Sequence, residues 1–377
     1  MKVAITGAGG NVGTALLRAM RGEDWEPVGI ARRRPDTTRE PYTLTRWVTC
    51  DIGEAAAIPV LTEAFADADA VVHLAWAIHP RREDPPMART NAVGSAHVMY
   101  AAAAAGVPQL VCASSAAAYA PAERWRRIDE SWALTGVPGS AYSLGKALLE
   151  QQLDAFERQH PAMRIARIRP CGIVQGAAAA QLAGWLFGSW LPRPLLGRRW
   201  VPVPLWKDLR LQLVHADDVA SAIRLILRQQ AEGAFNLAAD PALSAQALAA
   251  SFGGFRVPLS RRVAAAGVWA GWRSGLLPLH PGWITLADRA CLLDTGRARG
   301  ELGWVPHYDA GAVCDELVAA LRAGRVGDSG PLTPTHTPFR PGRPTHQSQD
   351  PDVRQVGATA VSAAGRETGN SGGFPER

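Results

Sequence analysis

A tyrosine and a lysine stand four residues apart in the stretch YSLGK, as Tyr142 and Lys146. At that spacing the two side chains lie on one face of a helix. An ammonium held near a phenol favours the phenolate and lowers the phenol's pKa from its usual value of about 10. The pair therefore predicts a tyrosine that exchanges a proton with a substrate hydroxyl or carbonyl. The alternative is a surface tyrosine and lysine on an amphipathic helix.

A serine precedes this pair along the chain. Ser115 ends the apolar run QLVCASS, which predicts a strand over residues 109–115, and a helix is predicted from Ser140 to His160, where Pro161 stops it. Because the strand comes just before the helix, we expect Ser115 at the same edge of the sheet. Its hydroxyl can then hydrogen-bond a substrate oxygen that gains charge as hydride moves. A helix cap or a turn serine is the alternative role.

Glycine is concentrated near the start of the chain, in TGAGGNVG from Thr6 to Gly13. The run KVAI before it predicts a strand and TALLRAM after it a helix, which is the context of a dinucleotide-binding turn rather than an ordinary strand–turn–helix. Gly7 permits the tight turn, Gly10 lets a pyrophosphate approach the backbone, and Gly13 lets the helix pack on the strand. The helix N-terminus offers free N–H groups to the phosphates. We expect cofactor contacts from Gly7, Gly10, Asn11, Val12 and Gly13.

Strand and helix signals alternate through the first half of the chain. Strands are predicted over residues 28–31, 46–50, 68–76, 109–115 and 164–170, and a long helix over 87–105. Such alternation predicts an α/β fold, a Rossmann-type doubly wound parallel sheet with helices on both faces. Ligands of this fold bind beyond the carboxyl ends of the strands. We predict an NAD(P)-binding Rossmann domain over residues 1–170 and a smaller C-terminal substrate-binding region over 171–325, with segments that return to the sheet.

Composition narrows the class of protein. The 377 residues are 47% apolar, and the net charge of +6 is not gathered in a block typical of nucleic-acid binding. The five cysteines form no CxxC pair, so we expect no disulfide framework, no metal site and a reducing cytoplasm. Residues 326–377 are rich in Pro, Gly, Ser and Thr without apolar periodicity, which predicts a disordered tail.

The partners expected from the sequence follow from what it lacks. It contains no run long enough to span a bilayer and no apolar segment of a signal peptide at its N-terminus. We expect a cytoplasmic protein with a small-molecule substrate, no nucleic-acid partner and no stable membrane association, with a homodimer as one possible assembly. Peripheral attachment to a membrane through the Trp- and Arg-rich residues 177–207 is the alternative.

A series of ordered motifs between residues 1 and 308 resembles one known family. The motifs are TGAGGNVG, DI at 51, HLAW at 73, TNAVGSAH with Asn91, SSAAAY at 114, YSLGK at 142, HADDVA at 215 and LGWVPHY at 302. Together they resemble the extended short-chain dehydrogenase/reductases, also called the NAD-dependent epimerase/dehydratase family. So many motifs in this order are very specific for that family.

The resemblance implies a role for each motif. Ser115, Tyr142 and Lys146 are the implied catalytic triad, with Lys146 also bonding the nicotinamide ribose. Implied cofactor contacts are Asp51 and Ile52 at the adenine, Leu74, Ala75 and Trp76 along the cofactor with Asn91 nearby, and Pro170 to Ile173, Cys171 among them, beside the nicotinamide. His215 and Asp217 lie in a motif that looks structural, and capping of the following helix is a role open to them.

The sequence departs from the family at two positions that bear on the substrate. Sugar-nucleotide dehydratases of the family usually carry an acidic pair soon after the catalytic hydroxyl, where this chain has Ala116, Ala117 and Ala118. Sugar-nucleotide epimerases usually carry an asparagine that holds the diphosphate, and Gly172 aligns with it. Both departures argue against a sugar-nucleotide substrate.

We therefore predict an NAD(P)-dependent oxidoreductase that transfers hydride at a carbonyl or secondary alcohol of a small, substantially apolar substrate. Aromatic residues after the sheet motivate the apolar pocket: Trp185, Phe187, Trp190, Trp200, Trp206, Trp269, Trp272 and Trp283. Core packing or a dimer contact is their alternative role. One competing function is a sugar-nucleotide epimerase, with Arg193, Arg198 and Arg199 as diphosphate ligands. The other is a non-catalytic NAD(P)-binding sensor.

The end of the second predicted strand indicates which dinucleotide binds. Arg32 and Arg33 stand there, and no acidic residue is placed to bind the adenosine ribose hydroxyls and repel a 2′-phosphate. Guanidinium groups bind phosphate in bidentate geometry, so we expect NADP(H), with NAD(H) possible. In calorimetric titrations, the double variant Arg32→Glu/Arg33→Glu should lose NADP(H) affinity selectively, by about tenfold to a hundredfold. Equal wild-type affinity for NAD(H) and NADP(H) would contradict the assignment.

Overall fold

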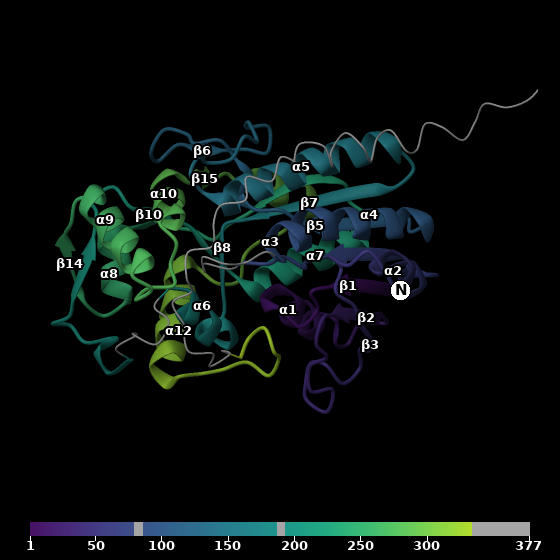
Figure 1. The fold of residues 1–377 in the computed structure, drawn as a ribbon, viewed down its shortest axis with the longest axis horizontal. Coiled ribbons are helices and arrows are strands. Elements are labelled where there is room, and N and C mark those ends of the chain that lie inside the picture. The colour runs from purple at the N-terminus through teal and green to yellow at the C-terminus, as the bar shows by residue number, and fades with distance from the viewer. Residues whose placement is uncertain (79–85, 187–192, 334–377) are drawn as a thin grey trace, which may run out of the picture. The chain divides into compact units, whose positions relative to one another are not determined.

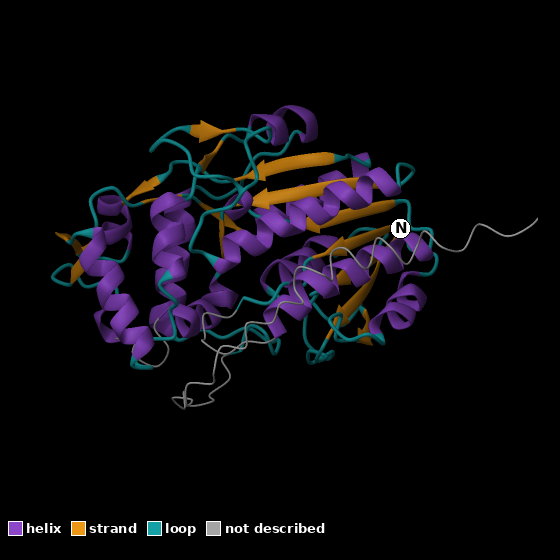
Figure 2. Cartoon of the chain, turned by 45° about the horizontal axis from the view of Figure 1, so that its top comes forward, coloured by secondary structure: helices purple, strands orange, loops and turns teal. Residues whose placement is uncertain are grey.

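A seven-stranded sheet lies at the centre of the computed structural model, which describes residues 1–78, 86–186 and 193–333. Its order is β12–β7–β5–β4–β1–β2–β3, and every neighbouring pair is parallel. The predicted Rossmann-type doubly wound sheet is confirmed, and Figure 2 shows its strands side by side. The strands are β1 (Lys2–Thr6), β2 (Glu26–Ala31), β3 (Arg46–Thr49), β4 (Ala70–His73), β5 (Gln109–Ala113), β7 (Arg164–Pro170) and β12 (Gly233–Leu237).

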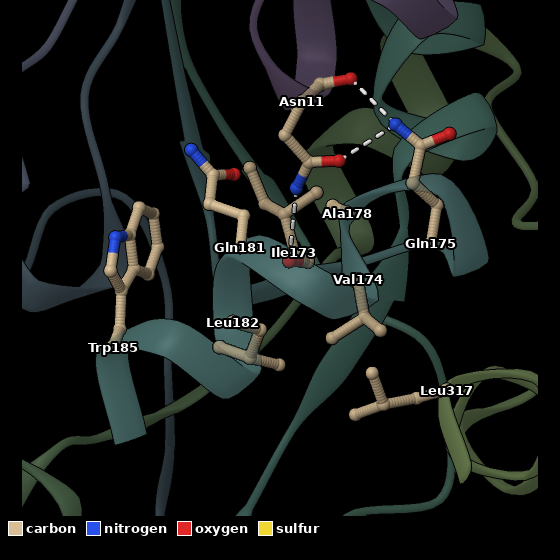
Figure 3. A pocket seen from close by; sticks show the side chains of 9 residues that line it. All are labelled: Asn11, Ile173, Val174, Gln175, Ala178, Gln181, Leu182, Trp185 and Leu317. Carbon is tan, nitrogen blue, oxygen red and sulfur yellow. Dashed lines mark hydrogen bonds between the residues drawn. The ribbon is translucent and has the colours of Figure 1, made fainter. Parts of the chain in front are cut away.

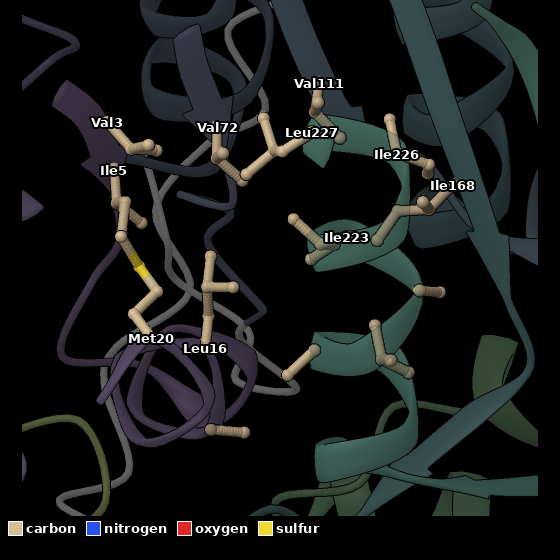
Figure 4. Close-up of a cluster of buried hydrophobic side chains, with 14 of the residues drawn as sticks. Val3, Ile5, Leu16, Met20, Val72, Val111, Ile168, Ile223, Ile226 and Leu227 are labelled. Carbon is tan, nitrogen blue, oxygen red and sulfur yellow. The ribbon is translucent and has the colours of Figure 1, made fainter. Parts of the chain in front are cut away.

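Helices cover both faces of the sheet (Figure 1). Helices α1 (Asn11–Met20), α7 (Ala216–Gln229) and α11 (Gly296–Leu302) pack on one face, and α2 (Ala57–Phe65), α4 (Gly94–Ala104) and α5 (Ala141–Gln159) on the other. Side chains alternate between the two faces along β1. Val3 and Ile5 belong to the first hydrophobic core, on the face covered by α1, α7 and α11, and Ala4 belongs to the second, on the opposite face. Figure 4 shows Leu16 of α1 and Ile223 of α7 in the first core.

The long helix predicted over residues 87–105 is interrupted. Its first turn, α3 (Pro86–Ala88), leads into a π-helical segment, Arg89–Val93, before α4 begins. At Gly94 a Cβ would lie 2.7 Å from Cγ1 of Ile52, so the helix passes too close to the β3 side of the sheet for any larger residue. The prediction of one regular helix is therefore wrong in this segment, and π-turns of this kind are frequent at functional sites.

The residues after β7 build a smaller set of helices and two-stranded pairs, and then return to the sheet through α7, β12 and α11. Residues Met1–Pro338 form one compact unit that includes both predicted regions. The short strands pair as β8 (Gly172–Val174) with β11 (Leu213–His215), β9 (Pro202–Leu205) with β14 (Phe255–Pro258), β10 (Arg210–Leu211) with β13 (Leu243–Ser244), and β6 (Arg127–Ile128) with β15 (Leu292–Leu293). The helices are α6 (Ala179–Leu186), α8 (Ala245–Ser251), α9 (Arg261–Arg273), α10 (Gly282–Arg289) and α12 (Ala310–Ala323), with 3-10 turns at Ala116–Ala118, Gly176–Ala178 and Arg193–Leu195.

A buried carboxylate fastens α5 to the sheet. Glu150 of α5 is fully buried and accepts hydrogen bonds from Nε and Nη2 of Arg169 on β7, at 2.7 and 3.0 Å. Arg167 of the same strand reaches the same carboxylate at 3.3 Å. Burial raises the pKa of Glu150, but the hydrogen bond and charge of Arg169 outweigh it and hold this pKa below its usual value. Arg169 also donates to the hydroxyl of Tyr119 at 2.9 Å, so the network reaches the loop after β5.

Removal of this carboxylate should destabilise the fold strongly. In Glu150→Ala, the guanidinium groups of Arg167 and Arg169 stay buried while a charged partner is lost, which typically costs about 3–5 kcal/mol. Urea unfolding followed by circular dichroism measures the loss. Glu157→Ala removes a half-exposed partner of Arg167 and should cost about 1 kcal/mol or less. Equal losses in the two variants would contradict a central role for Glu150.

Candidate active site

The glycine-rich turn joins β1 to α1 in the way the sequence predicts. Gly7 has φ +71° and its N–H donates to the carbonyl of Ile30 at 2.9 Å, while a Cβ there would lie 2.8 Å from the Ala75 nitrogen. A Cβ at Gly13 would lie 2.4 Å from the Gly7 carbonyl oxygen. Both glycines are therefore required by the backbone itself. A Cβ at Gly10 would lie 3.1 Å from the Gly7 carbonyl oxygen, so this position is less crowded than Gly7 or Gly13.

The N-terminus of α1 carries no charge or cap of its own. Its N-cap, Gly10, makes no side-chain hydrogen bond, and the first turn has no acidic residue. Asn11 instead turns toward β8, where its amide donates to the Ile173 carbonyl at 3.2 Å, and Gln175 donates to both oxygens of Asn11 at 2.7 Å (Figure 3). The open N–H groups of α1 fit the phosphates of a dinucleotide. Gln175 was not predicted, because no motif marks it.

The residues after β4 are fixed by hydrogen bonds beneath them. Thr6 and Ser95 bond the two ring nitrogens of His73, at 2.7 and 2.9 Å. Burial, with the charge of Lys146, lowers the pKa of His73 to about 3, so the ring is neutral. Asn91 pairs with the backbone of Ala77 through both its oxygen and its nitrogen, at 2.7 and 3.0 Å. These bonds set the path of Leu74, Ala75 and Trp76, and the amide of Asn91 is used in doing so.

Two other predicted cofactor positions lie after β3. Asp51 accepts the N–H of Gly53 at 3.0 Å and pairs with Arg89 at 3.3 Å, while Ile52 is buried against α4. Arg89 also binds Glu54 at 2.6 Å. The π-helical segment therefore brings a guanidinium to the carboxylate that was predicted to meet the adenine.

The three predicted catalytic side chains converge beside β5. Ser115 is buried at the N-terminus of the turn Ala116–Ala118, where its hydroxyl accepts the N–H of Ala117 at 3.1 Å. The Ser115 hydroxyl lies close enough to the Tyr142 phenol to influence the pKa of that phenol. Tyr142 and Lys146 lie in the first two turns of α5, as their spacing predicts, after the Ser140 N-cap. The bond to Ala117 shows that Ser115 has the capping role as well as a place in the cluster.

Lys146 lies in an enclosed and largely apolar environment. Its side chain is 3% exposed, its ammonium donates to the Ala113 carbonyl at 2.8 Å, and Nζ is 3.5 Å from the centre of the Trp76 ring. Burial lowers the pKa of Lys146 to about 7. Trp76 covers the ammonium in a cation–π contact, while its own buried Nε1 has no hydrogen-bond partner among the described residues.

The ionisation of Tyr142 differs from the prediction. Burial raises the pKa of the Tyr142 phenol, and the hydrogen bond with Ser115 opposes this without reversing it. The expected lowering by Lys146 is therefore wrong for this arrangement, because desolvation of the phenolate is the largest effect on this pKa and Lys146 is not among the groups that lower it. A phenol of this kind is protonated at neutral pH.

The predicted aromatic residues have different positions. Trp283 of α10 stacks on Tyr142, with ring centres 5.0 Å apart, and Trp185 lines a small cavity with Asn11 (Figure 3). Trp206 is core and Trp200 and Trp269 are exposed, so the prediction of a pocket wall fails for these three. Trp272 contacts His280 with ring centres 4.7 Å apart. Phe187, Trp190 and the side chain of Arg193 lie outside the described residues, and Arg198 and Arg199 are exposed.

Arg32 and Arg33 are exposed just after β2, and a segment from the far end of the chain reaches them. We call residues 326–333 the strap. Ser329 of the strap is buried and donates to the Gly9 carbonyl at 2.5 Å, and a Cβ at Gly330 would lie 3.6 Å from Nε of Arg33. The predicted disorder from residue 326 is therefore wrong for the strap, and residues 334–377 lie outside the described residues. Figure 1 shows the strap following α12 in yellow.

Three remaining predicted positions have structural contacts. The ring of His215 accepts a hydrogen bond from the N–H of Asp217 at 3.2 Å and so caps α7. Helix capping was one of the roles open to His215 from the sequence. Cys171 is half-buried between two parts of the core, and burial raises the pKa of its thiol. Among the described residues, no helix could cross a bilayer and no group of His, Cys, Asp and Glu side chains could hold a metal ion.

The sequence matches one family model and is similar to several known proteins. The family model described as NAD dependent epimerase/dehydratase matches residues 3–238. An uncharacterized protein of Mycobacterium tuberculosis is 26% identical over 87% of this chain, and the chain spans about a third (31%) of that relative's length. A 3-diazoavenalumate denitrifying reductase of a Streptomyces species is 29% identical, over 82% of this chain and 97% of the relative.

Solved structures share the fold. One is a UDP-glucose-4-epimerase from Stenotrophomonas maltophila with bound NAD and formylated UDP-arabinopyranose, which is 21% identical over 86% of this chain and 98% of that one, with a TM-score of 0.63. At this identity the likeness concerns the fold, and it agrees with the parallel sheet described above.

The depressed pKa of Lys146 predicts a pH dependence of stability. Between about pH 7 and the ordinary lysine pKa of 10.5, the unfolded chain binds a proton at Lys146 that the folded chain lacks. This lysine therefore makes the free energy of unfolding of the wild type increase with pH over that range. Lys146→Met should lack this rise, whereas Lys207→Met, at an exposed position, should keep it. Urea unfolding at several pH values between 7 and 10 measures the slopes. Identical slopes in wild type and Lys146→Met would rule out the burial effect.

Proposed function

The chain belongs to the NAD dependent epimerase/dehydratase family, and we propose that it is an NAD(P)-dependent oxidoreductase that reduces a carbonyl on a small, largely apolar substrate. The observation that carries the proposal is the position of Tyr142 beside Ser115, with Trp283 stacked on the tyrosine and Lys146 one helical turn away. This arrangement offers a proton donor, a second hydroxyl for the same substrate oxygen, and an aromatic wall beside them.

The described residues fit a dinucleotide. The turn from Gly7 to Gly13 and the uncapped N-terminus of α1 would hold the pyrophosphate, and Arg32 and Arg33 suit the additional phosphate of NADP(H). Lys146, buried beside β5, would bond the nicotinamide ribose. When bound in reduced form, the nicotinamide supplies the hydride.

The residues of this chain would supply the proton and the charge stabilisation. Tyr142, protonated at neutral pH because burial raises its pKa, donates to the carbonyl oxygen of the substrate as hydride reaches the carbon. The Ser115 hydroxyl donates to the same oxygen as charge develops on it. A neutral phenol is the form needed for reduction, and that is the direction we propose.

An apolar substrate agrees with the walls of the site. Trp283 and Trp76 present indole rings next to Tyr142 and Lys146. Ala116, Ala117 and Ala118 are all buried, so the position of the dehydratase acid–base pair holds no titratable group. The Streptomyces relative is by its name a reductase, which supports net reduction as a reaction for a chain of this kind.

The test is a panel assay with the full chain. Aromatic and alicyclic ketones with NADPH should give steady consumption of the cofactor, and uridine or thymidine diphosphate sugars should give none. Interconversion of a sugar nucleotide without net cofactor consumption would replace the proposal with the epimerase function. Cofactor binding without turnover of any substrate in the panel would favour the sensor.

Tyr142→Phe isolates the proton donor. The phenyl ring keeps the stacking on Trp283, but the hydroxyl is lost, so turnover should fall by about 10²- to 10⁴-fold with cofactor affinity nearly unchanged. Steady-state kinetics on the best ketone and fluorescence titration with NADPH measure the two effects. Tyr100→Phe, at an exposed tyrosine on α4, is the matched control and should match wild type. A wild-type rate in Tyr142→Phe would exclude the mechanism.

A further inference from the structure

A second cavity, of about 480 Å³, is lined by residues from the loop after the Ala116–Ala118 turn, from β10, and from α9 and α10. Its volume is within the usual range of small-molecule sites, about 300–1,000 Å³. Four arginines line it, Arg124, Arg210, Arg261 and Arg289, and Asp288 is its one acidic lining residue. A cavity with this lining is built for negative charge.

The carboxylates nearby do not balance the arginines. Asp288 is buried and pairs with Nη2 of Arg124 at 3.1 Å and Nε of Arg261 at 3.3 Å. Asp208, which is exposed, accepts from Arg124 through its backbone carbonyl at 2.9 Å, and its charge also acts on Arg210. Four guanidinium groups therefore face two carboxylates, and an excess of two positive charges remains at the cavity.

Arg210 is held at the cavity by backbone carbonyls and not by a carboxylate. It is 3% exposed, and its two terminal nitrogens donate only to backbone carbonyls, those of Asp288 at 2.9 Å and Ala290 at 3.0 Å. Its Nε is buried without a hydrogen-bond partner among the described residues. Burial, and then the charge of Arg124, lowers the pKa of Arg210. A ligand in the cavity does not reach this buried N–H, so the contribution of Arg210 to the cavity is the charge of a guanidinium whose terminal nitrogens bind no carboxylate.

We propose that this cavity binds the phosphate group of a small molecule. Arginines bind phosphate oxygens in bidentate geometry, and a phosphate dianion matches the excess charge of the cavity. The volume leaves room for an organic group beside the phosphate, so the ligand is a phosphate ester of a small molecule.

The phosphate site is separate from the candidate active site, because the two use different faces of α10. Trp283 and Leu286 pack in the cluster with Tyr142, whereas Ala287 faces the cluster of Trp206. Asp288 bonds the Trp206 indole at 3.0 Å. Five residues along a helix turn the direction by about 140°, so Trp283 and Asp288 point to different sides.

A ligand in the cavity would fasten α9 to α10. Helix α9 has no buried residue, and the pairing of its first residue, Arg261, with Asp288 is one of its ties to α10. A phosphate between Arg261 and Arg289 adds a second bridge between these helices. Since α10 also carries Trp283, the ligand stabilises the wall of the active site from behind.

The test is titration of the full chain with inorganic phosphate, by calorimetry and thermal unfolding, at a constant ionic strength set with chloride. Wild type should bind one phosphate and show a raised unfolding temperature. Arg261→Ala/Arg289→Ala removes two lining arginines and should weaken binding by about tenfold or more. Arg262→Ala/Arg273→Ala removes two exposed α9 arginines that do not line the cavity, and it should bind like wild type.

Two results would overturn the site. One is no saturable binding up to about 10 mM phosphate, which is weaker than a specific site requires. The other is an equal loss in the two double variants, which would indicate general attraction of anions to a basic protein. Tyr142→Phe should bind phosphate like wild type, so failure of the proposed reduction would leave this test intact.

Discussion

The burial of Glu150 is the constraint that holds the candidate site together. It lies on α5 one turn beyond Lys146 and two beyond Tyr142, on the face that meets the sheet. A carboxylate without water needs its positive partners, and both are on β7. The helix is therefore held in one rotational and axial position on the sheet, and the face that carries Tyr142 lies beside Ser115, just after β5.

Burial changes the pKa values of Tyr142 and Lys146 more than the charges and hydrogen bonds of their neighbours do. The phenol of Tyr142 and the ammonium of Lys146 are both pushed toward their neutral forms by desolvation. Aromatic rings cover both groups, Trp283 on the tyrosine and Trp76 on the lysine. At neutral pH a tyrosine in this environment keeps its proton, and the protonated phenol is the form that can act as a donor to a substrate oxygen, as the proposed reduction requires.

Local pattern was enough to predict the parallel sheet, the turn from Gly7 to Gly13 and the helix that starts after Ser140, because each depends on residues close in sequence. The π-turn at Arg89–Val93 was not predicted, because nothing in the residue pattern distinguishes it from the α-helix that follows. The ionisation of Tyr142 also depends on burial, which no spacing reveals. Composition placed the tryptophans after the sheet but could not distinguish Trp283 at the site from Trp206 in the core.

The strap brings the two ends of the described chain together. Ser329 bonds the carbonyl of Gly9 across 320 residues of sequence, and Asp328 pairs with Arg39 at 2.5 Å. Leu332 is fully buried just beyond. A protein shortened to the end of α12 would keep every strand of the sheet and still lose the hydroxyl that bonds this carbonyl of the turn. In protein engineering, the boundary for a C-terminal truncation or purification tag therefore lies after residue 333, because a cut before Ser329 removes a hydrogen bond to the glycine turn.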